Sequence, residues 1–435
     1  MTKAKYLFAL MLLPCALCAQ ASYFPPTNSF NWDTISLEEA GFCADNEQAL
    51  YDYLEETNTD AFLLLKDGKI VMEQYFGNFT RFSSHLWNSA GKSLMAFTAG
   101  IAVGLDSLNV EDPVADYLGT GWTNCPETEA AIRVIHQLTM TSGLSDQTIE
   151  LFCTDPECLV CLATPGERWA YHNGPYTLLG EVIESAVEQD LNDFIDDRIQ
   201  ALTGITGSFS YLGDNRIYLS NARAMARFGL LVANEGTWDG TPVINDPEYF
   251  RAMINSSQDI NPSYGYLWWL NGKDNYRLPS LQTDFPGPIM TEAPAETIAA
   301  IGKNGQIINV VPSQGLVMVR MGGSPSDDSL VPTFYNDSIW SRINALSCTT
   351  TIENRVDVST LRVFPNPAAE EIRVSATKAM LRGAIYNYAG DLLREAPVTG
   401  ATDASISLAG LPAGLLLVRI GFADGSYRWE RVVRQ

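Results

Sequence analysis

A serine and a lysine three residues apart have the types and the spacing for nucleophilic chemistry. Ser89 and Lys92 directly precede an apolar run at 94–103. If Ser89 opens a helix through this run, the two side chains lie about one turn apart on the same face. A lysine among apolar neighbours loses part of its preference for the charged form, so Lys92 could help accept the proton of the Ser89 hydroxyl. Free backbone N–H groups at the helix start could face a developing oxyanion.

The same spacing also fits an N-cap serine followed by a lysine at the surface. Isolated matches to Ser-x-x-Lys arise often by chance, and the surface interpretation is the common one. The hypothesis of a nucleophile therefore depends on which residues accompany Ser89 and Lys92 elsewhere in the chain.

The composition indicates a globular protein of two or three domains. The chain has 435 residues, 46% of them hydrophobic, and a formal net charge of −23. Such an acidic chain should repel nucleic acid and anionic membrane surfaces, so nucleic acid is not predicted as a partner. We interpret the acidity as a source of solubility and not as a sign of a charged substrate.

Residues 1–19 have the features of a secretory signal peptide. Two lysines form a basic start, and the apolar run at 6–17 is too short to span a bilayer. Small residues follow, and we favour cleavage before Gln20. No later stretch is long and apolar enough for a membrane helix, so no integral membrane segment is predicted after the signal is removed.

Six cysteines follow the signal, and an even number in an exported chain predicts disulfides. The six are Cys43, Cys125, Cys153, Cys158, Cys161 and Cys348. Their spacing alone leaves the pairing open, and the C-x-x-C at 158–161 also fits a redox pair or half of a zinc site. No second C-x-x-C follows the predicted signal peptide, and the whole chain has only three histidines. We therefore predict neither a metal nor any other cofactor.

Strand patterns lie near both ends of the first 348 residues, and helical patterns fill the middle. Apolar runs on either side of a turn at 66–69 predict one hairpin, and the stretch 298–321 predicts a second. Helices are predicted in the second half of 37–54, through 89–103, at 131–144, in two stretches after 173, at 222–232 and around 339–346. One sheet built from both termini and flanked by helices explains this order.

The composition changes after Cys348. Residues 349–360 are polar and predict a linker. From 361 to 435, short strand patterns alternate with turn residues, which predicts a small β-sandwich without catalytic residues. The strands are predicted at 372–374, 385–388, 405–408, 415–420 and 427–433.

Three motifs in order resemble the serine β-lactamase and penicillin-binding-protein superfamily. They are Ser-Ala-Gly-Lys at 89–92, Tyr-His-Asn at 171–173 and Ala-Ile-Gly-Lys-Asn-Gly-Gln at 300–306. The resemblance covers about 35–347 and is closest to the class C-like branch with family VIII esterases and 6-aminohexanoate-dimer hydrolases. It implies an α/β (α+β) fold over 20–348, in which helices and a mostly helical subdomain flank an antiparallel sheet.

The resemblance also implies a role for each motif residue. Ser89 would be the acylated nucleophile, and Lys92 would help deprotonate it. Tyr171 would be the partner base, its phenol acidified by Lys92, because an unperturbed phenol has a pKa near 10. Asn173 would bind Lys92 and the substrate amide. Without this resemblance, Tyr171 and Asn173 would be interpreted as residues of an ordinary loop.

The third motif departs from the β-lactamase pattern. Ala300 occupies the place of a basic residue, and Lys303 follows Gly302, so its side chain need not point the same way. The backbone N–H groups of Ser89 and of Lys303, on an edge strand, would form the oxyanion hole. A missing cation argues against a β-lactam carboxylate and favours esters or linear amides.

Two further expectations follow from the resemblance. In this fold the first and last helices pack side by side, which implies a disulfide between Cys43 and Cys348, with the other four cysteines paired among themselves. His172 lies between two motif residues but is expected to point away. We predict structural roles for it and for His85 and His136.

The tail resembles a type IX secretion C-terminal sorting domain. The resemblance rests on Val-Phe-Pro-Asn-Pro at 363–367, Tyr-Ala-Gly at 388–390 and Leu-Pro-Ala-Gly at 411–414. It implies export through the periplasm, the type IX machinery as a partner, and a secreted or cell-surface location. A carbohydrate-binding sandwich is the alternative.

Together these features predict a secreted serine hydrolase that cleaves an ester or amide bond through an acyl-enzyme on Ser89. Its substrate would be a small ester or amide, or a peptide. One alternative is a catalytically silent relative that binds penicillin or cell-wall peptides, and another is a true β-lactamase or D-Ala-D-Ala peptidase. The sequence does not identify the acyl donor, because loops of unknown shape form the pocket.

Overall fold

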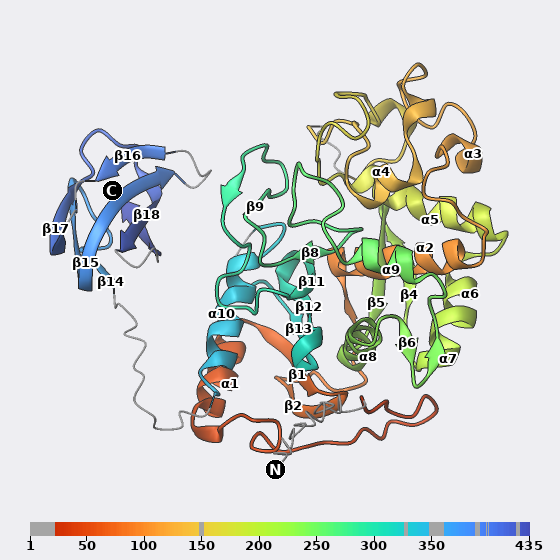
Figure 1. The fold of residues 1–435 in the computed structure, drawn as a ribbon, viewed down its shortest axis with the longest axis horizontal. Coiled ribbons are helices and arrows are strands. Elements are labelled where there is room, and N and C mark those ends of the chain that lie inside the picture. Colours follow the sequence, from red (N-terminus) through yellow and green to blue (C-terminus); the bar gives the residue numbers. More distant parts are fainter. Residues whose placement is uncertain are drawn as a thin grey trace, which may run out of the picture.

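Two separate hydrophobic cores organise the chain in the computed structural model (Figure 1). The structure describes residues 22–147, 152–325, 329–347, 361–387, 392–396, 398, 400–422 and 427–435. The larger core draws on residues between Trp32 and Leu346, and the smaller one on residues between Ala368 and Val432. The predicted signal peptide and the predicted linker lie outside the described residues, so these boundaries stay predictions.

A six-stranded antiparallel sheet runs through the larger core. Its strands lie in the order β2-β1-β13-β12-β11-β8. Their bounds are β1 Thr59–Lys66, β2 Lys69–Tyr75, β8 Trp269–Leu270, β11 Ile298–Gly302, β12 Gln306–Val311 and β13 Leu316–Gly322. Because β1 pairs along its length with β13, one sheet is indeed built from both ends of this unit. The predicted second hairpin is a three-stranded meander, since the chain also turns at Lys303–Gly305.

Helices cover both faces of this sheet, which explains why β12 and β13 are buried along their whole length. Figure 1 shows α1 (Glu47–Glu56) and α10 (Thr333–Asn344) on one side and α8 (Ala222–Ala233) on the other. Helix α8 lies close to the strands because Gly229 has no side chain. A Cβ there would come within 2.4 Å of Val317. The helix therefore needs glycine at this position.

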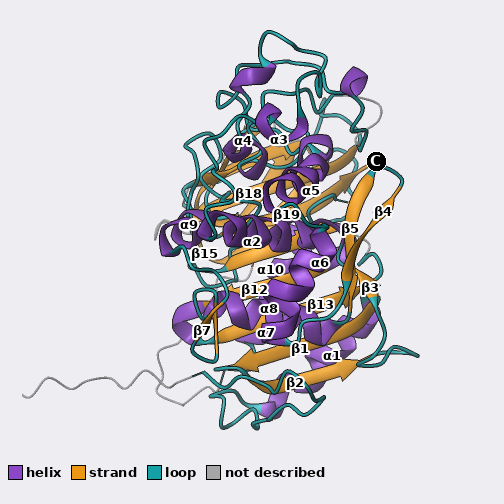
Figure 2. Ribbon diagram, turned by 90° about the vertical axis from the view of Figure 1, so that its right-hand side faces the viewer, coloured by secondary structure: helices purple, strands orange, loops and turns teal. Residues whose placement is uncertain are grey.

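The remaining helices build a mostly helical part beside the sheet (Figure 2). They are α2 Gly91–Gly104, α3 Ala115–Leu118, α4 Val134–Leu138, α5 Asn173–Val187, α6 Leu191–Ile195, α7 Ala201–Thr203 and α9 Pro247–Met253. The predicted helix at 131–144 is much shorter, because the chain turns at Met140 and Gly143, both with positive φ. Within the described ranges, no helix has both the length and the apolar character to cross a membrane.

Short strands complete this unit. A three-stranded sheet has the order β3-β5-β4, and two further pairs are β6-β7 and β9-β10. Their bounds are β3 His85–Leu86, β4 Ser208–Leu212, β5 Asn215–Ser220, β6 Thr237–Trp238, β7 Thr241–Pro242, β9 Asn275–Tyr276 and β10 Phe285–Pro286. Strand β3 leads directly to Ser89, so its pairing with β5 fixes the approach to the predicted nucleophile.

Two disulfides join four cysteines of the helical part, Cys125 to Cys161 and Cys153 to Cys158. This confirms that these four pair among themselves. The two cysteines of the C-x-x-C motif belong to different disulfides and do not form a redox pair.

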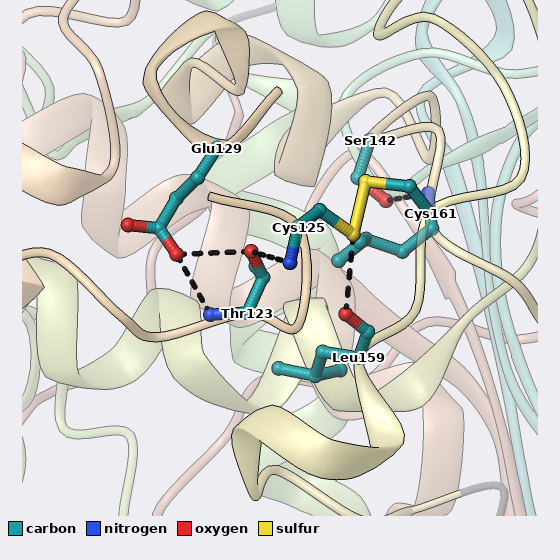
Figure 3. The surroundings of a disulfide bond; sticks show 7 residues. Thr123, Cys125, Glu129, Ser142, Leu159 and Cys161 are labelled. Carbon is teal, nitrogen blue, oxygen red and sulfur yellow. Dashed lines mark hydrogen bonds between the residues drawn. A yellow bond between two sulfur atoms is a disulfide. The ribbon is translucent and has the colours of Figure 1, made fainter. Parts of the chain in front are cut away.

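A buried polar cluster supports the first of these disulfides (Figure 3). The carboxylate of Glu129 accepts hydrogen bonds from the Thr123 backbone N–H (2.8 Å) and hydroxyl (2.9 Å). The Thr123 hydroxyl oxygen in turn accepts the Cys125 backbone N–H at 3.2 Å. The loop before the disulfide is therefore held by its own side chains.

Cys43 is also disulfide-bonded. Its backbone N–H donates to the Leu346 carbonyl at 2.6 Å, which places it beside the end of the first unit. Its predicted partner, Cys348, lies outside the described residues, so this pairing stays a prediction.

The tail is an all-β unit of antiparallel strands. Its strands are β14 Leu361–Phe364, β15 Glu371–Asn387, β16 Leu392–Ala396, β17 Ala401–Ser407, β18 Gly414–Phe422 and β19 Tyr427–Arg434. The strands predicted at 372–374 and 385–388 are parts of one long strand, β15. It pairs first with β14 and β17 and then with β16 and β18. The predicted turn at 388–390 lies outside the described residues.

Candidate active site

Ser89 lies in a 3-10 turn, Asn88–Ala90, that leads directly into α2. The sequence analysis expected Ser89 to open the helix, and the structure places it just before the first helical residue. Asn88 adopts a positive φ of 49°, which is unusual for a residue with a side chain. Its side-chain amide donates to the Lys303 carbonyl at 2.8 Å. This contact ties the turn that carries Ser89 to the end of β11.

Lys92 is buried, with 2% of its surface exposed. Its Nζ lies 3.2 Å from Ser89 Oγ and donates to Asn173 Oδ1 at 2.8 Å. The ring centroids of Tyr176 and Tyr171 lie 4.0 Å and 5.3 Å from Nζ. No carboxylate of the described chain forms an ion pair with it. Burial therefore lowers the pKa of Lys92 to about 7 and outweighs the attraction of the rings for a cation.

Tyr171 completes the contact with the nucleophile, because its hydroxyl and that of Ser89 are hydrogen-bonded. The ring stacks on Trp269 with centroids 5.9 Å apart. Burial raises the pKa of Tyr171 above its ordinary value, and the hydrogen bond to Ser89 only partly offsets this. The predicted acidification of the phenol by Lys92 is therefore wrong. Burial disfavours both charged forms, the phenolate and the ammonium ion, so the phenol stays neutral.

Asn173 is the first residue of α5, where it reaches Lys92. The next residue must be small, because a Cβ on Gly174 would come within 2.6 Å of the Cys153 carbonyl oxygen. The loop closed by the Cys153–Cys158 disulfide thus packs against the start of α5. The disulfide loop therefore helps position Asn173.

Gly302 lets β11 approach the turn that carries Ser89. A Cβ there would lie 2.6 Å from the Trp87 carbonyl oxygen and 2.9 Å from the Ser89 backbone nitrogen. Ala300 is buried, whereas the Lys303 side chain is exposed. Strand β8 lies outside β11 but pairs only with Ile298 and Ala299. Among the described strands, the end of β11 that faces Ser89 has no partner on its outer side. Lys303, expected on this edge strand, lies one residue beyond it in the 3-10 turn Lys303–Gly305.

Two of the three histidines have a ring nitrogen beside a backbone group of a residue nearby in the chain. His136 Nδ1 accepts the Arg133 backbone N–H at 3.0 Å, and His85 Nδ1 lies 2.9 Å from the Leu86 carbonyl oxygen. Burial lowers the pKa of His172 to about 4, so this ring is neutral at pH 7. These surroundings agree with the predicted structural roles.

The sequence analysis did not identify the aromatic surroundings of the site. Tyr176 follows Asn173 by three residues on α5, so helical spacing could have placed both beside Lys92. Trp169, Tyr264 and Trp269 surround Tyr171 and pack edge to face on one another, with centroids 4.9–6.0 Å apart. Their positions depend on contacts between distant segments, which no local pattern reveals.

A serine, a desolvated lysine and a tyrosine thus meet between an antiparallel sheet and a helical subdomain, as in the β-lactamase fold, whose family consists mostly of serine hydrolases. The β-lactamase family model matches residues 48–329, so the chain belongs to that family. The model of the secretion system C-terminal sorting domain matches residues 362–434. This domain indicates type IX secretion to the cell surface or the extracellular space.

The comparisons with individual proteins support the same fold. An uncharacterized protein of Alkalihalophilus pseudofirmus is 24% identical over 296 residues, 59% of this chain and 81% of the relative. A candidate 6-aminohexanoate-dimer hydrolase from Bacillus anthracis has a TM-score of 0.56 at 16% identity, covering 74% of this chain and 88% of that one. A candidate β-lactamase from Bacteroides dorei has a TM-score of 0.55 at 17% identity, covering 70% and 99%.

Proposed function

We propose that this protein cleaves an ester or amide bond through an acyl-enzyme on Ser89. One observation carries the proposal: a lysine with a pKa of about 7 lies 3.2 Å from the serine hydroxyl. An amine of ordinary pKa would stay protonated at pH 7 and could not act as a base. With a pKa of about 7, about half of the Lys92 side chains are neutral at pH 7, and these can accept the proton of Ser89.

The proposed reaction has two stages. Lys92 Nζ takes the Ser89 proton while Oγ attacks the substrate carbonyl carbon, and the backbone N–H groups of Ser89 and Lys303 bind the oxyanion. The bond to the leaving alcohol or amine then breaks. The leaving group receives the proton from Lys92 through the neutral hydroxyl of Tyr171. Water cleaves the acyl ester by the same route and releases the acid.

Asn173 supports this assignment by accepting a hydrogen bond from Lys92 at 2.8 Å. A neutral amine has two N–H donors and one lone pair. One donor directed at Asn173 helps orient the lone pair toward Ser89. Asn173 is therefore proposed to hold Lys92 and to bind a substrate amide.

Esters and linear amides are the favoured substrates. Ala300 replaces the cation expected to bind a β-lactam carboxylate, and the Lys303 side chain is exposed. One structural neighbour is described as a candidate 6-aminohexanoate-dimer hydrolase. The alternatives are a β-lactamase or D-Ala-D-Ala peptidase, and a relative that binds such ligands without turnover.

Covalent labelling tests the mechanism. A fluorophosphonate should add to the protein once, and peptide mass mapping should place the label on Ser89. The Ser89→Ala variant should neither react nor turn over p-nitrophenyl esters. Hydrolysis of p-nitrophenyl esters, nitrocefin, D-Ala-D-Ala peptides and linear aminohexanoate amides would then rank the acyl donors. An unlabelled Ser89 in a folded protein, or full turnover by Ser89→Ala, would refute the acyl-enzyme.

We propose that 20–348 and 361–435 are independent units. A chain that ends after Cys348 should keep its turnover, because no proposed catalytic residue lies in the tail. In its own kind of cell the same truncation should abolish export. A truncated chain that folds but loses turnover would show that the tail forms part of the site. A truncated chain that still reaches the medium would show that the tail is not the export signal.

A further inference from the structure

A cavity of about 320 Å³ lies apart from the residues proposed for catalysis. Its wall combines the segment 27–30, the loop at 81–82 and the N-terminal end of α8. Three arginines line it, Arg81, Arg223 and Arg227. This concentration of positive charge is unusual in a chain whose formal net charge is −23.

Only one of the three arginines has a carboxylate partner among the described residues. Arg223 forms a two-pronged pair with Glu73, with Nε–Oε1 2.6 Å and Nη2–Oε2 2.7 Å. Arg227 is buried and donates to the carbonyl oxygens of Thr203 (2.7 Å) and Pro26 (2.8 Å). Arg81 is exposed, and no ion pair of the described chain includes it. The cavity wall therefore carries more positive than negative charge.

The carbonyl contacts satisfy the hydrogen bonds of Arg227 but do not neutralise its charge. Burial, together with the charge of Arg223, lowers the pKa of Arg227 to about 10. Its guanidinium still stays protonated at pH 7. Guanidinium groups match the geometry of carboxylate, phosphate and sulfate oxygens better than other side chains do. An oxyanion in this cavity would supply the negative charge that the protein does not.

Two further features of the wall are suited to such a ligand. The cavity includes Asn221, the N-cap of α8, whose side chain accepts the Ala224 backbone N–H at 2.9 Å, and the positive end of the helix dipole favours anions. Phe30 and Phe82 are 67% and 58% exposed, and their rings meet edge to face at 5.1 Å. The Arg81 guanidinium lies 4.8 Å from the Phe82 ring centroid. An apolar surface therefore adjoins the positive one.

We propose that this cavity binds a small ligand that carries an oxyanion and an apolar group. The oxyanion would lie against the arginines, and the apolar group against Phe30 and Phe82. The competing explanation is that Arg223 and Arg227 only fasten the N-terminal segment, since both also donate to its carbonyl groups. Arg81 separates the two explanations, because it makes no such contact with that segment.

Calorimetric titration of the full-length protein at low chloride tests the proposal. Inorganic phosphate, benzoate and phenyl phosphate serve as probes, and phenyl phosphate should bind most tightly. Arg81→Gln should lower the affinity for phenyl phosphate about fivefold, as expected for the loss of one exposed charge-assisted contact. The matched control is Arg198→Gln, which removes another exposed arginine that lies 6.0 Å from a phenylalanine ring centroid. The control should bind like the wild type.

A second variant tests the apolar part of the wall. Phe82→Ser should lower the affinity for phenyl phosphate and benzoate and leave the affinity for inorganic phosphate unchanged. The ratio of phosphate to benzoate affinity tells which class of oxyanion the cavity prefers, and thermal melting checks that each variant is folded. The proposal is overturned if no probe binds saturably in the millimolar range. It is equally overturned if Arg81→Gln and Arg198→Gln bind all probes like the wild type.

Discussion

Lys92 and Arg227 are both buried without a carboxylate partner among the described residues, and their surroundings give opposite results. Lys92 contacts an amide oxygen and aromatic rings, and burial lowers its pKa from 10.5 to about 7. Arg227 contacts backbone carbonyl oxygens, and its pKa falls from 12.5 to about 10. At pH 7 the lysine can become a neutral base, whereas the arginine stays a cation.

The comparison shows that burial alone does not create a base. Desolvation lowers the pKa of both groups, but arginine starts so high that it does not reach neutral pH. The residue type therefore determines the state of a buried basic group at neutral pH. A lysine can lose its proton and act as a base, whereas an arginine stays charged and attracts an anion. Lysine beside a serine fits proton transfer, and arginines around a cavity fit anion binding.

The largest expected effect comes from exchanging the two cation types at the serine. Lys92→Arg should lower kcat/KM for a p-nitrophenyl ester by on the order of 10⁴, because a guanidinium cannot accept the Ser89 proton. Lys92→Met should lower kcat/KM by a similar factor. Steady-state kinetics measure kcat/KM of variants whose circular dichroism spectra match that of the wild type. An arginine variant within about tenfold of the wild type would exclude Lys92 as the general base.

A smaller loss is expected from the tyrosine that contacts Ser89. Tyr171→Phe should reduce kcat on the order of 10², since it removes one proton-transfer group and keeps the ring. Tyr176→Phe is the matched control, because its ring also lies against Lys92 but its hydroxyl points to the Arg216 carbonyl at 3.4 Å. Single-turnover kinetics should show a near-normal rate for the control. Equal losses in both variants would argue against a specific role for Tyr171.

The pH dependence should follow the state of Lys92. The base must be neutral, and its neutral fraction rises with pH through about 7. The rate of acylation should therefore fall about tenfold per pH unit below about pH 6 and level off above about pH 8. This profile is measured by stopped-flow kinetics of acylation, with an ester whose leaving group does not titrate in the same pH range. A rate that is flat between pH 5 and 8 would contradict a lysine base in the free enzyme.

The smallest effect concerns stability. Lys92→Met should raise the free energy of unfolding by about 1–2 kcal/mol at pH 6, because it removes a buried amine. The pH dependence of this difference follows from proton binding. Between pH 7 and 10.5, Lys92 is protonated in the unfolded wild type but neutral in the folded one, so the stability of the wild type rises with pH. The advantage of methionine should therefore be full below pH 7 and shrink toward pH 10.

Urea unfolding at several pH values measures this advantage. Arg227→Met is the contrast, and it should destabilise the protein, because the Thr203 and Pro26 carbonyl groups lose their donor. A Lys92→Met variant that is less stable than the wild type at pH 6 would mean that the amine contributes more through its contacts than burial costs.

Much of the site could be predicted because its motifs are local. Ser89 and Lys92 lie within one turn of sequence, so their spacing indicated that the two side chains could act together, whereas Tyr171 and Asn173 were assigned through the resemblance to the family. The hairpin of β1 and β2 could also be predicted, because apolar runs on both sides of a turn are a local signal. The separate tail strands predicted at 372–374 and 385–388 were wrong for the opposite reason: β15 continues through both, held by pairing with strands far along the chain.

The tertiary structure alone decided how these residues behave. Burial sets the pKa of Lys92 and Tyr171, and it depends on Tyr176, Trp269 and other segments that meet only in the folded chain. The direction predicted for Tyr171 was wrong because the sequence showed a neighbouring cation but not the loss of water around both groups. The arginine-lined cavity was not foreseen for the same reason. Desolvation and charge balance are sums over neighbours in space, and sequence patterns report only neighbours along the chain.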